Sequence, residues 1–547
     1  MFALNSSAST ALPIDDVLPD IVAALREGHA LVVEAPPGAG KTTRVPRALF
    51  EAGVVEGEIW ILEPRRLPAR LAAERVAREL GERVGETVGY TVRFEDVSSP
   101  RTRLRFVTEG LLTRRLLADA RLAGVGAVVL DEFHERHVAT DLSLALLRRL
   151  QTSTRPDLRV CAMSATLEAA PLRQFLGGCA GVRSEGRLHP IEIEQLPTPD
   201  DRPLHEQVTG AVRRLARDGL DGDVLVFLPG AGEIRRAQEL ITAAPGMSAF
   251  AVLPLHGELP LEDQARAVRL DPARRKIILS TNVAESSITV EGVVAVVDAG
   301  LARVATHSPW TGLPTLAVAK VSQASATQRA GRAGRVRPGR ALRLYTRADF
   351  ESRPEHDAPE ILRLDLAQTE LDLAALGAVD VPWLEPPPEG HVRAARELLG
   401  RLRAIGPDGQ VTATGRAMLR CAVHPRAARV LVEAERRGVA EDACVAAAIL
   451  VEGDLRASSR ARFGDARGQD TATESSDLGA LLDLYREAED ARFSASALRA
   501  AGLDPGATHA VARAAKQLER ATRRVSGADA VTGARGRSAD EELRIAL

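Results

Sequence analysis

The sequence predicts an α/β fold in which two tandem domains, each with a parallel sheet, precede a mainly helical region. Two segments alternate short β-rich runs with helical patterns, which is the signature of parallel sheets. Beyond about residue 355 the β-rich runs end, while helical patterns continue. A chain of 547 residues is also too long for one hydrophobic core, and its length suggests about three or four domains.

Each of the two segments is predicted to contain buried strands. In the first segment they are ALVVEA (30–35), EIWIL (58–62), LRFV (104–107), GAVVL (126–130) and LRVCAM (158–163). In the second they are DVLVFL (223–228), AFAVLPL (249–255), KIILS (276–280), VVAVVD (293–298) and ALRLY (341–345). The stretch HPIEIEQLPTPDDRP (189–203) is interpreted as the connector, because its prolines and acids break either pattern. The two domains are therefore assigned to residues 1–190 and 191–357.

The helical region is expected to hold a winged helix followed by a helical bundle. Residues 392–419 combine a helix, a tight turn and short strands, so 358–420 are assigned to a winged-helix domain. The pattern is helical from His424 onward, so 421–547 are assigned to a helical bundle. The polar interval 454–479 is interpreted as an exposed loop, with disorder as its default state. The capping-box pattern SADE (538–541) predicts a last helix. Because the chain stops soon after it, a C-terminal continuation is expected to be missing.

The composition limits the compartment and the kind of partner. A formal net charge of −2 argues against a uniformly basic nucleic-acid coat, but a local basic groove is compatible with it. The four cysteines form no CxxC pair, which fits a reducing compartment. The N-terminus has no basic region of a signal peptide, and no apolar run reaches the length of a membrane span. A soluble, cytoplasmic protein without membrane contact is expected.

The segment APPGAGKTT (35–43) falls between a predicted strand and a predicted helix, where a phosphate-binding loop belongs. Its glycines let backbone N–H groups face phosphates, and the helix N-terminus adds partial positive charge. Lys41 would reach the β- and γ-phosphates, and the Thr42 hydroxyl would ligate Mg²⁺. Ala35 stands where the strict pattern has glycine, so the match is to the relaxed form. The residues predicted to bind the nucleotide here are Gly38, Ala39, Gly40, Lys41, Thr42 and Thr43.

The stretch DEFHERH (131–137) places carboxylates directly after a buried strand. Asp131 is predicted to hold Mg²⁺, and Glu132 to orient or deprotonate the attacking water. A zinc site is disfavoured, because the two histidines are three residues apart, whereas the zinc-protease pattern has them four apart. The sequence SAT (164–166) is in position to touch His134 and to pass on the state of the nucleotide. The alternative is that the SAT segment simply caps the end of the strand.

The segment QRAGRAGR (328–335) is the second strong motif. Its glycines permit close helix packing, and Arg332 and Arg335 would lie on one helix face at i, i+3. Arginines from a second domain that meet the γ-phosphate act as arginine fingers, which contribute about 10³–10⁵ in rate. A solvated basic helix is the alternative, but it leaves the spaced glycines unexplained.

The order of these motifs resembles that of superfamily 2 DEAH-box ATP-dependent helicases. The series covers roughly residues 12–450 and consists of GAGKTT, EPRR (63–66), TEG (108–110), DEFH, SAT, FLPG (227–230), TNVAESSIT (281–289) and QRAGRAGR. Several motifs in one fixed order are far more specific than any single match. The combination of LPI near the start, EPRR and DEFHER is most similar to the bacterial HrpB type. Phe133, which replaces the alanine of the DEAH box, is a change associated with that type.

The resemblance implies two RecA-like P-loop domains that share one NTPase site, followed by a winged helix and a ratchet-like helical bundle. Its catalytic residues would be Lys41, Glu132, Gln328, Arg332 and Arg335, with Thr42 and Asp131 at Mg²⁺, Glu291 near the nucleotide, and His134, Ser164 and Thr166 coupling the domains. The backbone of a single strand would contact Arg65, Arg66, Arg93, Phe94, Thr108, Gly230, Thr281 and Asn282. Residues 300–320 would form a β-hairpin that helps to part strands, and Trp310 would pack within it or wedge against a base.

The resemblance also implies a helicase or translocase that hydrolyses ATP or another NTP with Mg²⁺. It would track along single-stranded nucleic acid, RNA in preference to DNA, in the 3′→5′ direction. Because aromatic residues make up only 3% of the chain, binding should depend on phosphate contacts and weaken with salt. Two alternatives stay open, namely an ATPase that remodels ribonucleoproteins without processive unwinding, and a nucleic-acid-binding scaffold with a passive nucleotide site. Intact Lys41, Glu132 and Arg335 count against the scaffold.

Overall fold

The structure is a computed structural model, and it divides the chain into two compact units. It describes residues 11–92, 95–165, 169–186, 189–271, 273–286, 288, 290–307, 314–335, 337–378, 380–421, 423–452, 455–456, 477–523 and 539–546. The first unit comprises Met1–Leu364 and Asp380–Pro387, and the second comprises Asp365–Val379 and Pro388–Leu547. Each unit is considered by itself below.

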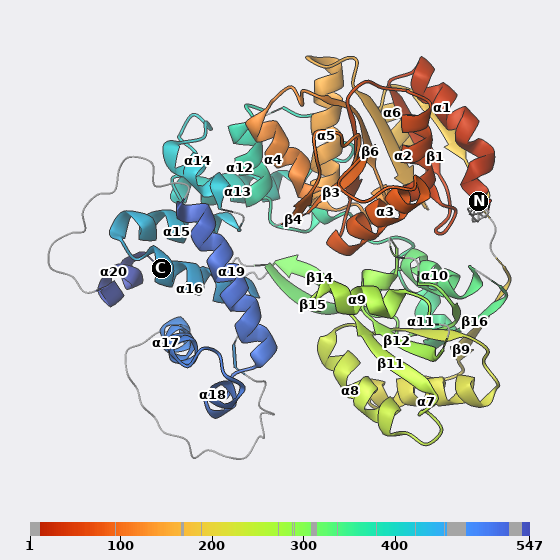
Figure 1. The fold of residues 1–547 in the computed structure, drawn as a ribbon. Helices are drawn as coiled ribbons and strands as arrows, with labels where there is room; N and C mark the ends of the chain where they lie inside the picture. Colours follow the sequence, from red (N-terminus) through yellow and green to blue (C-terminus); the bar gives the residue numbers. More distant parts are fainter. Residues whose placement is uncertain are drawn as a thin grey trace, which may run out of the picture. The chain divides into compact units, whose positions relative to one another are not determined.

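The first domain of unit 1, drawn in red to orange in Figure 1, is built on an eight-stranded sheet with the order β4-β3-β5-β2-β6-β7-β1-β8. All neighbouring strands are parallel except the β3–β4 pair. The strands are β1 Ala30–Glu34, β2 Glu58–Glu63, β3 Val88–Val92, β4 Glu95–Val97, β5 Leu104–Thr108, β6 Val125–Leu130, β7 Arg159–Ser164 and β8 Ala180–Arg183. The five strands predicted for this segment are therefore confirmed. They were visible in the sequence because strands buried on both faces are almost continuously apolar.

Helices cover this sheet. They are α1 Leu18–Glu27, α2 Lys41–Glu51, α3 Arg66–Glu79, α4 Gly110–Ala118, α5 Val138–Thr152 and α6 Ala169–Phe175. Side chains of α1, α2 and α3 form one buried cluster with Leu31 and Val33 of β1. This packing fixes the start of α2 at the carboxyl end of β1, which is where open parallel sheets bind their ligands.

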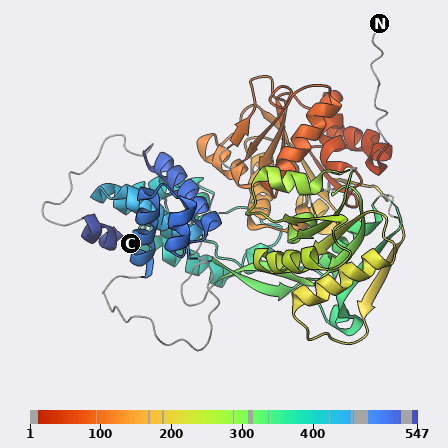
Figure 2. The ribbon, with the colours of Figure 1, turned by 60° about the horizontal axis from the view of Figure 1, so that its bottom comes forward.

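The second domain of unit 1 has a six-stranded, all-parallel sheet with the order β11-β12-β10-β13-β16-β9. Its strands are β9 Ile191–Leu196, β10 Asp223–Phe227, β11 Phe250–Leu255, β12 Arg275–Ser280, β13 Val293–Asp298 and β16 Gly339–Thr346. The helices α7 Leu204–Arg217 and α8 Ala231–Ala243 pack against one face, and α9 Leu261–Val268 and α10 Gln323–Gly331 against the other (Figures 1 and 2). The two parallel-sheet domains expected from the sequence are thus present.

Strand β9 corrects the interpretation of residues 189–203 as a plain connector. Ile191 and Ile193 alternate with Glu192 and Glu194, and the strand pairs in parallel with β16 at the sheet edge. The two acids lie within 3.6 and 2.6 Å of Arg340 on β16. An edge strand exposes part of its length to solvent, so it is less apolar than a central strand and was missed.

A two-stranded antiparallel sheet joins Leu301–His307 (β14) to Pro314–Lys320 (β15). This is the hairpin expected at residues 300–320. Trp310, expected within it, lies outside the described residues, as do Arg93, Phe94 and Thr166.

Unit 2 is helical. Its helices are α12 Ala367–Ala375, α13 Glu389–Arg401, α14 Ala413–Arg420, α15 Pro425–Arg437, α16 Ala440–Glu452, α17 Asp477–Asp490, α18 Ala495–Ala500, α19 Pro505–Arg523 and α20 Ala539–Ala546. An antiparallel bridge between Ile405 and Val411 separates α13 from α14, an order that fits the winged helix predicted for 358–420. Helix α20 begins where the capping-box pattern predicted a helix. Most of the polar interval 454–479 lies outside the described residues.

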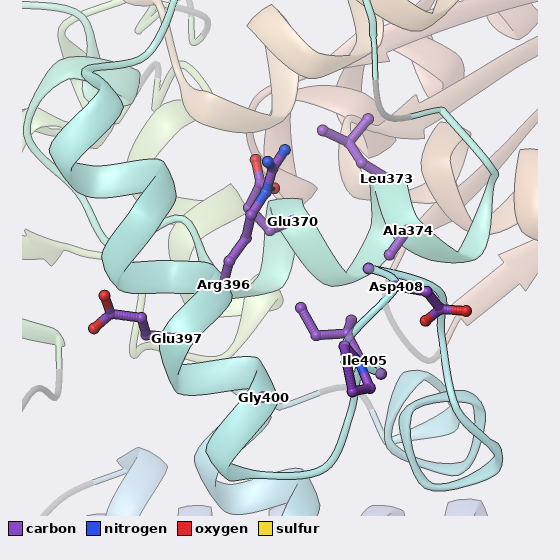
Figure 3. Close-up of a pocket in the computed structure, with 11 residues that line it drawn as sticks. Glu370, Leu373, Ala374, Arg396, Glu397, Gly400, Ile405 and Asp408 are labelled. Atoms are coloured by element: carbon purple, nitrogen blue, oxygen red, sulfur yellow. Dashed lines mark hydrogen bonds and ion pairs between the residues drawn. The ribbon is translucent and has the colours of Figure 1, made fainter.

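A cavity of about 620 Å³ opens in unit 2 between α12, α13 and the turn that follows α13 (Figure 3). Arg396 and Glu370 lie side by side on its wall, 2.7 Å apart. None of the residues predicted to bind nucleotide or nucleic acid lines this cavity. Among the described residues, no helix combines the length and apolarity that a membrane crossing requires.

Candidate functional site

The loop between β1 and α2 forms a backbone cradle. Gly38 and Gly40 have φ values of 86° and 95°, which are costly for residues that carry a Cβ. A Cβ at Gly40 would also lie 2.6 Å from Cδ1 of Leu12. The backbone N–H of Ala39 donates to the carbonyl of Pro36 at 3.1 Å, and that of Thr43 to the carbonyl of Gly40 at 3.2 Å. The glycines are therefore required by the loop conformation and by the close approach of the N-terminal segment.

Four side chains predicted to act together do meet at the carboxyl ends of β1 and β6. Nζ of Lys41 lies 2.9 Å from Oε1 of Glu132 and 4.0 Å from Oδ1 of Asp131. The Thr42 hydroxyl donates to the Asp131 carboxylate. Glu132 has left-handed backbone geometry at φ 49°, and its N–H donates to Oδ1 of Asp131 at 2.8 Å. Such a strained turn aims both carboxylates at one place.

Burial and neighbouring charges shift the pKa values of this cluster in opposite directions. Burial raises the pKa of Asp131 to about 6, although the positive charge of Lys41 opposes the shift. Burial also acts to raise the pKa of Glu132, but the charges of Lys41 and His134 and the hydrogen bond from Lys41 together outweigh it, so this pKa is lowered. Glu132 is therefore the group of the pair that is held as a carboxylate. Its Oε2 atom is buried and has no hydrogen-bond partner among the described residues.

Glu63 is a member of this cluster that sequence reasoning did not assign. It ends β2, its side chain is fully buried, and both carboxyl oxygens lack a hydrogen-bond donor in the described part of the chain. Burial and the nearby charge of Asp131 raise its pKa well above the ordinary value. The signal was available, because Glu63 ends a buried strand in the EPRR motif, as Asp131 directly follows one.

His134 links the two domains of unit 1. Its Nδ1 atom accepts from the backbone N–H of Ala165 at 3.3 Å, and the side-chain amide of Gln328 lies 3.2 Å from its Nε2 atom. Burial lowers the pKa of His134, which favours the neutral ring. The contact with the SAT segment therefore runs through Ala165, beside the predicted Ser164 at the end of β7.

The three arginines of QRAGRAGR have different neighbours. Arg329 is buried and donates to Glu285 at 2.8 Å and to Asp298 at 2.9 Å. Arg332 is buried too, and its guanidinium donates to the carbonyls of Glu285, Ser286 and Ile288. The sequence placed Arg332 and Arg335 on one helix face, but α10 ends at Gly331, and Arg332 turns into its own domain.

Arg335 instead lies against the loop of the first domain. A Cβ at Gly38 would be 3.5 Å from Nε and 3.6 Å from Cδ of Arg335. Burial lowers the pKa of this guanidinium to about 10, while the charge of Glu132 partly opposes the shift. A second-domain arginine is thus placed at the loop that would hold the phosphates.

Five of the residues predicted to contact nucleic acid lie at the carboxyl edges of the two sheets. Thr108 ends β5, and Arg65 follows the neighbouring strand β2. In the second domain, Gly230 follows β10, while Thr281 and Asn282 follow its neighbour β12. Carboxyl ends of neighbouring parallel strands share one edge, so the residues of each domain form a common rim.

Two further predicted residues, Arg66 and Glu291, lie on the surface. Arg66 is exposed at the first turn of α3. Glu291 is exposed before β13, and its backbone N–H donates to the carbonyl of Val268 at 3.4 Å. A Cβ at Gly230 would lie 2.7 Å from Nε of Arg303 in the hairpin. The structure therefore places the backbone of Glu291 against the end of α9.

Comparison with known proteins decides the family. A model described as "DEAD/DEAH box helicase" matches residues 17–175, and one described as "Helicase conserved C-terminal domain" matches residues 208–337. The chain belongs to the DEAD/DEAH-box helicase family. Within this family it is 42% identical, over 447 residues, to a protein of Escherichia coli (strain K12) named ATP-dependent RNA helicase HrpB. That alignment covers 81% of this chain and 55% of the relative.

Two solved structures of E. coli family members also match this chain. A DEAH/RHA helicase HrpB matches with a TM-score of 0.79 and 38% identity, over 94% of this chain and 61% of that one. A DExH-box NTPase HrpB matches with a TM-score of 0.74 and 38% identity, over 95% of this chain and 59% of that one. The chain thus spans little more than half the length of the helicases that it matches.

Proposed function

We propose that this chain is an ATP-dependent helicase or translocase that hydrolyses NTP to move along single-stranded nucleic acid and unwind duplexes. The observation that carries the proposal is the meeting of Lys41, Asp131 and Glu132 with an arginine of the second domain, Arg335, at one glycine-rich loop. This arrangement supplies the parts that phosphoryl transfer needs from the protein. The similarity to a protein named an RNA helicase supports RNA as the preferred strand.

The donor set fits Mg²⁺. The Thr42 hydroxyl and the Asp131 carboxylate are hydrogen-bonded to each other, so both oxygens are already directed to one point. Mg²⁺ prefers oxygen ligands and is usually held by one or two protein groups together with phosphate oxygens. When bound, it would neutralise charge on the transferred phosphoryl group. Thr42 and Asp131 would hold it.

Glu132 is proposed to take the proton of the attacking water. Its Oε1 atom is occupied by Lys41 in this structure, whereas its buried Oε2 atom has no hydrogen-bond donor in the described part of the chain. Because Lys41 turns to the phosphates when they bind, the Glu132 carboxylate is released to accept a water proton. Before the nucleotide binds, the nearby charge of Lys41 lowers the pKa of Glu132 and keeps it ionised, so the carboxylate is ready to accept the proton.

Arg335 is proposed as the arginine finger, and Arg332 as a positioning residue. Arg335 lies at Gly38 in the loop, whereas Arg332 holds the backbone of residues 285–288. Gln328 and His134 would report domain closure to Ser164 and Thr166. We also propose that Glu291 lies near the bound nucleotide. The proposed domains are the two RecA-like domains at 1–190 and 191–357, the winged helix at 358–420 and the helical bundle at 421–547.

The single strand is proposed to lie along the rim formed by the carboxyl ends of the strands. Its contacts would be Arg65, Arg66, Arg93, Phe94, Thr108, Gly230, Thr281 and Asn282. The 3′→5′ direction and a cytoplasmic location complete the proposal. Remodelling of ribonucleoproteins without processive unwinding is the second candidate, and it would use the same hydrolysis site.

Glu132→Gln tests the proposal. It should keep ATP binding but lower turnover by about 10²–10⁴-fold, the usual contribution of a general base. Glu51→Gln, an equal change of charge at an exposed position of α2, is the control. ATP turnover is measured with and without single-stranded RNA or DNA at two salt concentrations.

The direction and the unwinding are tested with duplexes that carry a 3′ or a 5′ overhang. Separation of only the 3′-overhang duplex is expected. Stimulated hydrolysis without separation of either duplex would favour the remodelling ATPase. Near-normal turnover by the Glu132 variant would remove Glu132 from its assigned role.

A further inference from the structure

Arg65, a proposed phosphate contact, is already engaged within the protein. Its Nη1 atom lies 3.1 Å from Oε1 of Glu135, and its Nη2 atom lies 2.8 Å from Oε2 of the same residue. Nη1 also donates to the hydroxyl of Ser286 at 2.8 Å. The guanidinium therefore makes a bidentate contact with the Glu135 carboxylate. Its second partner, Ser286, comes from the other domain.

Glu135 is the centre of these contacts. Besides Arg65, it accepts from the Ser286 hydroxyl and lies 3.3 Å from Nε2 of His137. Burial acts to raise its pKa, but the charges of Arg65 and His137 outweigh it and lower the pKa to about 2. Glu135 is thus a carboxylate throughout the physiological pH range, and it occupies the place of an oxyanion on Arg65.

A phosphate and Glu135 cannot both hold the same fork of Arg65. Bidentate pairing uses two parallel N–H donors for one planar oxyanion, and carboxylate and phosphate suit the same donors. The pair is partly accessible, since the Arg65 side chain is 23% exposed and that of Glu135 12% exposed. A strand can therefore reach the guanidinium, but only by displacing the carboxylate.

Glu135 lies close in sequence and structure to the hydrolysis site. Glu135 ends the 3-10 turn Phe133–Glu135, whose N-cap is Glu132. Its backbone N–H donates to the carbonyl of Glu132 at 2.9 Å. Glu135 is therefore one turn away from the proposed water-activating residue and is hydrogen-bonded to its backbone.

We propose that Glu135 is a positioning residue that competes with the nucleic-acid phosphate for Arg65, and so sets the concentration of single strand at which NTP hydrolysis is stimulated. The proposal rests on the proposed function, because it requires that the chain bind a single strand through Arg65. In the strand-free protein Glu135 holds Arg65 and Ser286 together. In the strand-bound protein a phosphate replaces Glu135 on Arg65.

Glu135→Gln tests this inference, because it removes the competing charge and keeps a hydrogen-bonding group of the same size. Binding of a fluorescent single-stranded oligouridylate, measured by anisotropy, should tighten by about tenfold, the size of one hydrogen bond to a charged group. The RNA concentration for half-maximal ATPase stimulation should fall by a similar factor, with the maximal rate kept. Glu51→Gln controls for the change of net charge.

A double-mutant cycle with Arg65→Ala separates competition from a structural effect. Arg65→Ala alone should weaken binding, and in that background Glu135→Gln should change affinity no further. Glu135→Asp keeps the charge but shortens the reach to Arg65, and it should give an intermediate gain, which keeps the test available if Glu135→Gln does not fold.

The outcomes distinguish the inference from the proposed function. If Arg65→Ala weakens RNA binding but Glu135→Gln leaves the affinity unchanged, the competition is refuted and the helicase proposal stands. Equal tightening by Glu135→Gln with and without Arg65 would also refute it, because the effect would not act through Arg65. If the wild-type chain binds neither RNA nor DNA, the proposed function fails, and this inference fails with it.

Discussion

His137 should make the stability of the first domain depend on pH between about 6.5 and 9. Its Nδ1 atom lies 3.5 Å from Oε2 of Glu109, and its Nε2 atom lies 3.3 Å from Oε2 of Glu135. Burial acts to lower the pKa of His137, but the hydrogen bond to Glu109 and the charges of Glu135 and Glu109 raise it to about 9. The imidazolium thus bridges one buried and one partly buried carboxylate.

The magnitude follows from the pKa difference between the folded and unfolded chain. An unfolded histidine titrates near 6.5, so the rise of the pKa to about 9 in the folded chain corresponds to roughly 3 kcal/mol of free energy of unfolding. Because the folded pKa is the higher one, this stabilisation is complete below pH 6.5. It is lost as the pH rises through 9.

Urea unfolding at pH 6 and pH 9.5 measures the effect. The wild type should be more stable than His137→Gln at pH 6, and most of that difference should disappear at pH 9.5. His29→Gln, at an exposed position, is the control and should follow the wild type. Ring-proton NMR gives the pKa directly, and a His137 signal that titrates near 6.5 would refute the reasoning.

Three more substitutions test the site and its support. Arg335→Ala should lower the ATPase rate by about 10³-fold at unchanged ATP affinity, while the control Arg337→Ala should not; an unaltered rate would place the finger elsewhere. Arg329→Met breaks a buried pair with Glu285 and Asp298 and should cost about 3–5 kcal/mol in unfolding. The control Arg347→Met, whose side chain is 80% exposed, should change little, and equal losses would contradict the buried-pair argument. Gly40→Ala should cost about 2 kcal/mol and weaken ATP binding. Gly53→Ala, which also has positive φ but open space around it, should cost less and leave calorimetric ATP affinity intact.

The strands of both sheets could be predicted where burial on two faces makes the sequence continuously apolar. GAVVL at 126–130 became β6, and VVAVVD at 293–298 became β13. A strand that is buried on one face only lacks this continuous apolar run. Ile191 and Ile193 alternate with glutamates in β9, so the apolar run is broken and the edge strand was interpreted as a connector.

The chemistry of single residues could be predicted better than their partners. A carboxylate at the end of a buried strand identified Asp131, and the same rule would have identified Glu63. By contrast, the contact of Glu135 with Ser286 joins residues that are 151 positions apart, and no local pattern encodes such a meeting. The separate roles of Arg332 and Arg335 likewise depend on where α10 ends, which the repeated glycines do not specify.

The short connection between β8 and β9 limits how far the two domains of unit 1 can separate. Strand β8 ends at Arg183 and β9 begins at Ile191, so a fully extended connection spans at most about 28 Å between these two residues. Arg335 is consequently present at the loop of the first domain at an effective concentration on the order of millimolar, whatever the concentration of the protein. Engagement of the arginine is therefore an event within one chain, and its rate should not change when the protein is diluted.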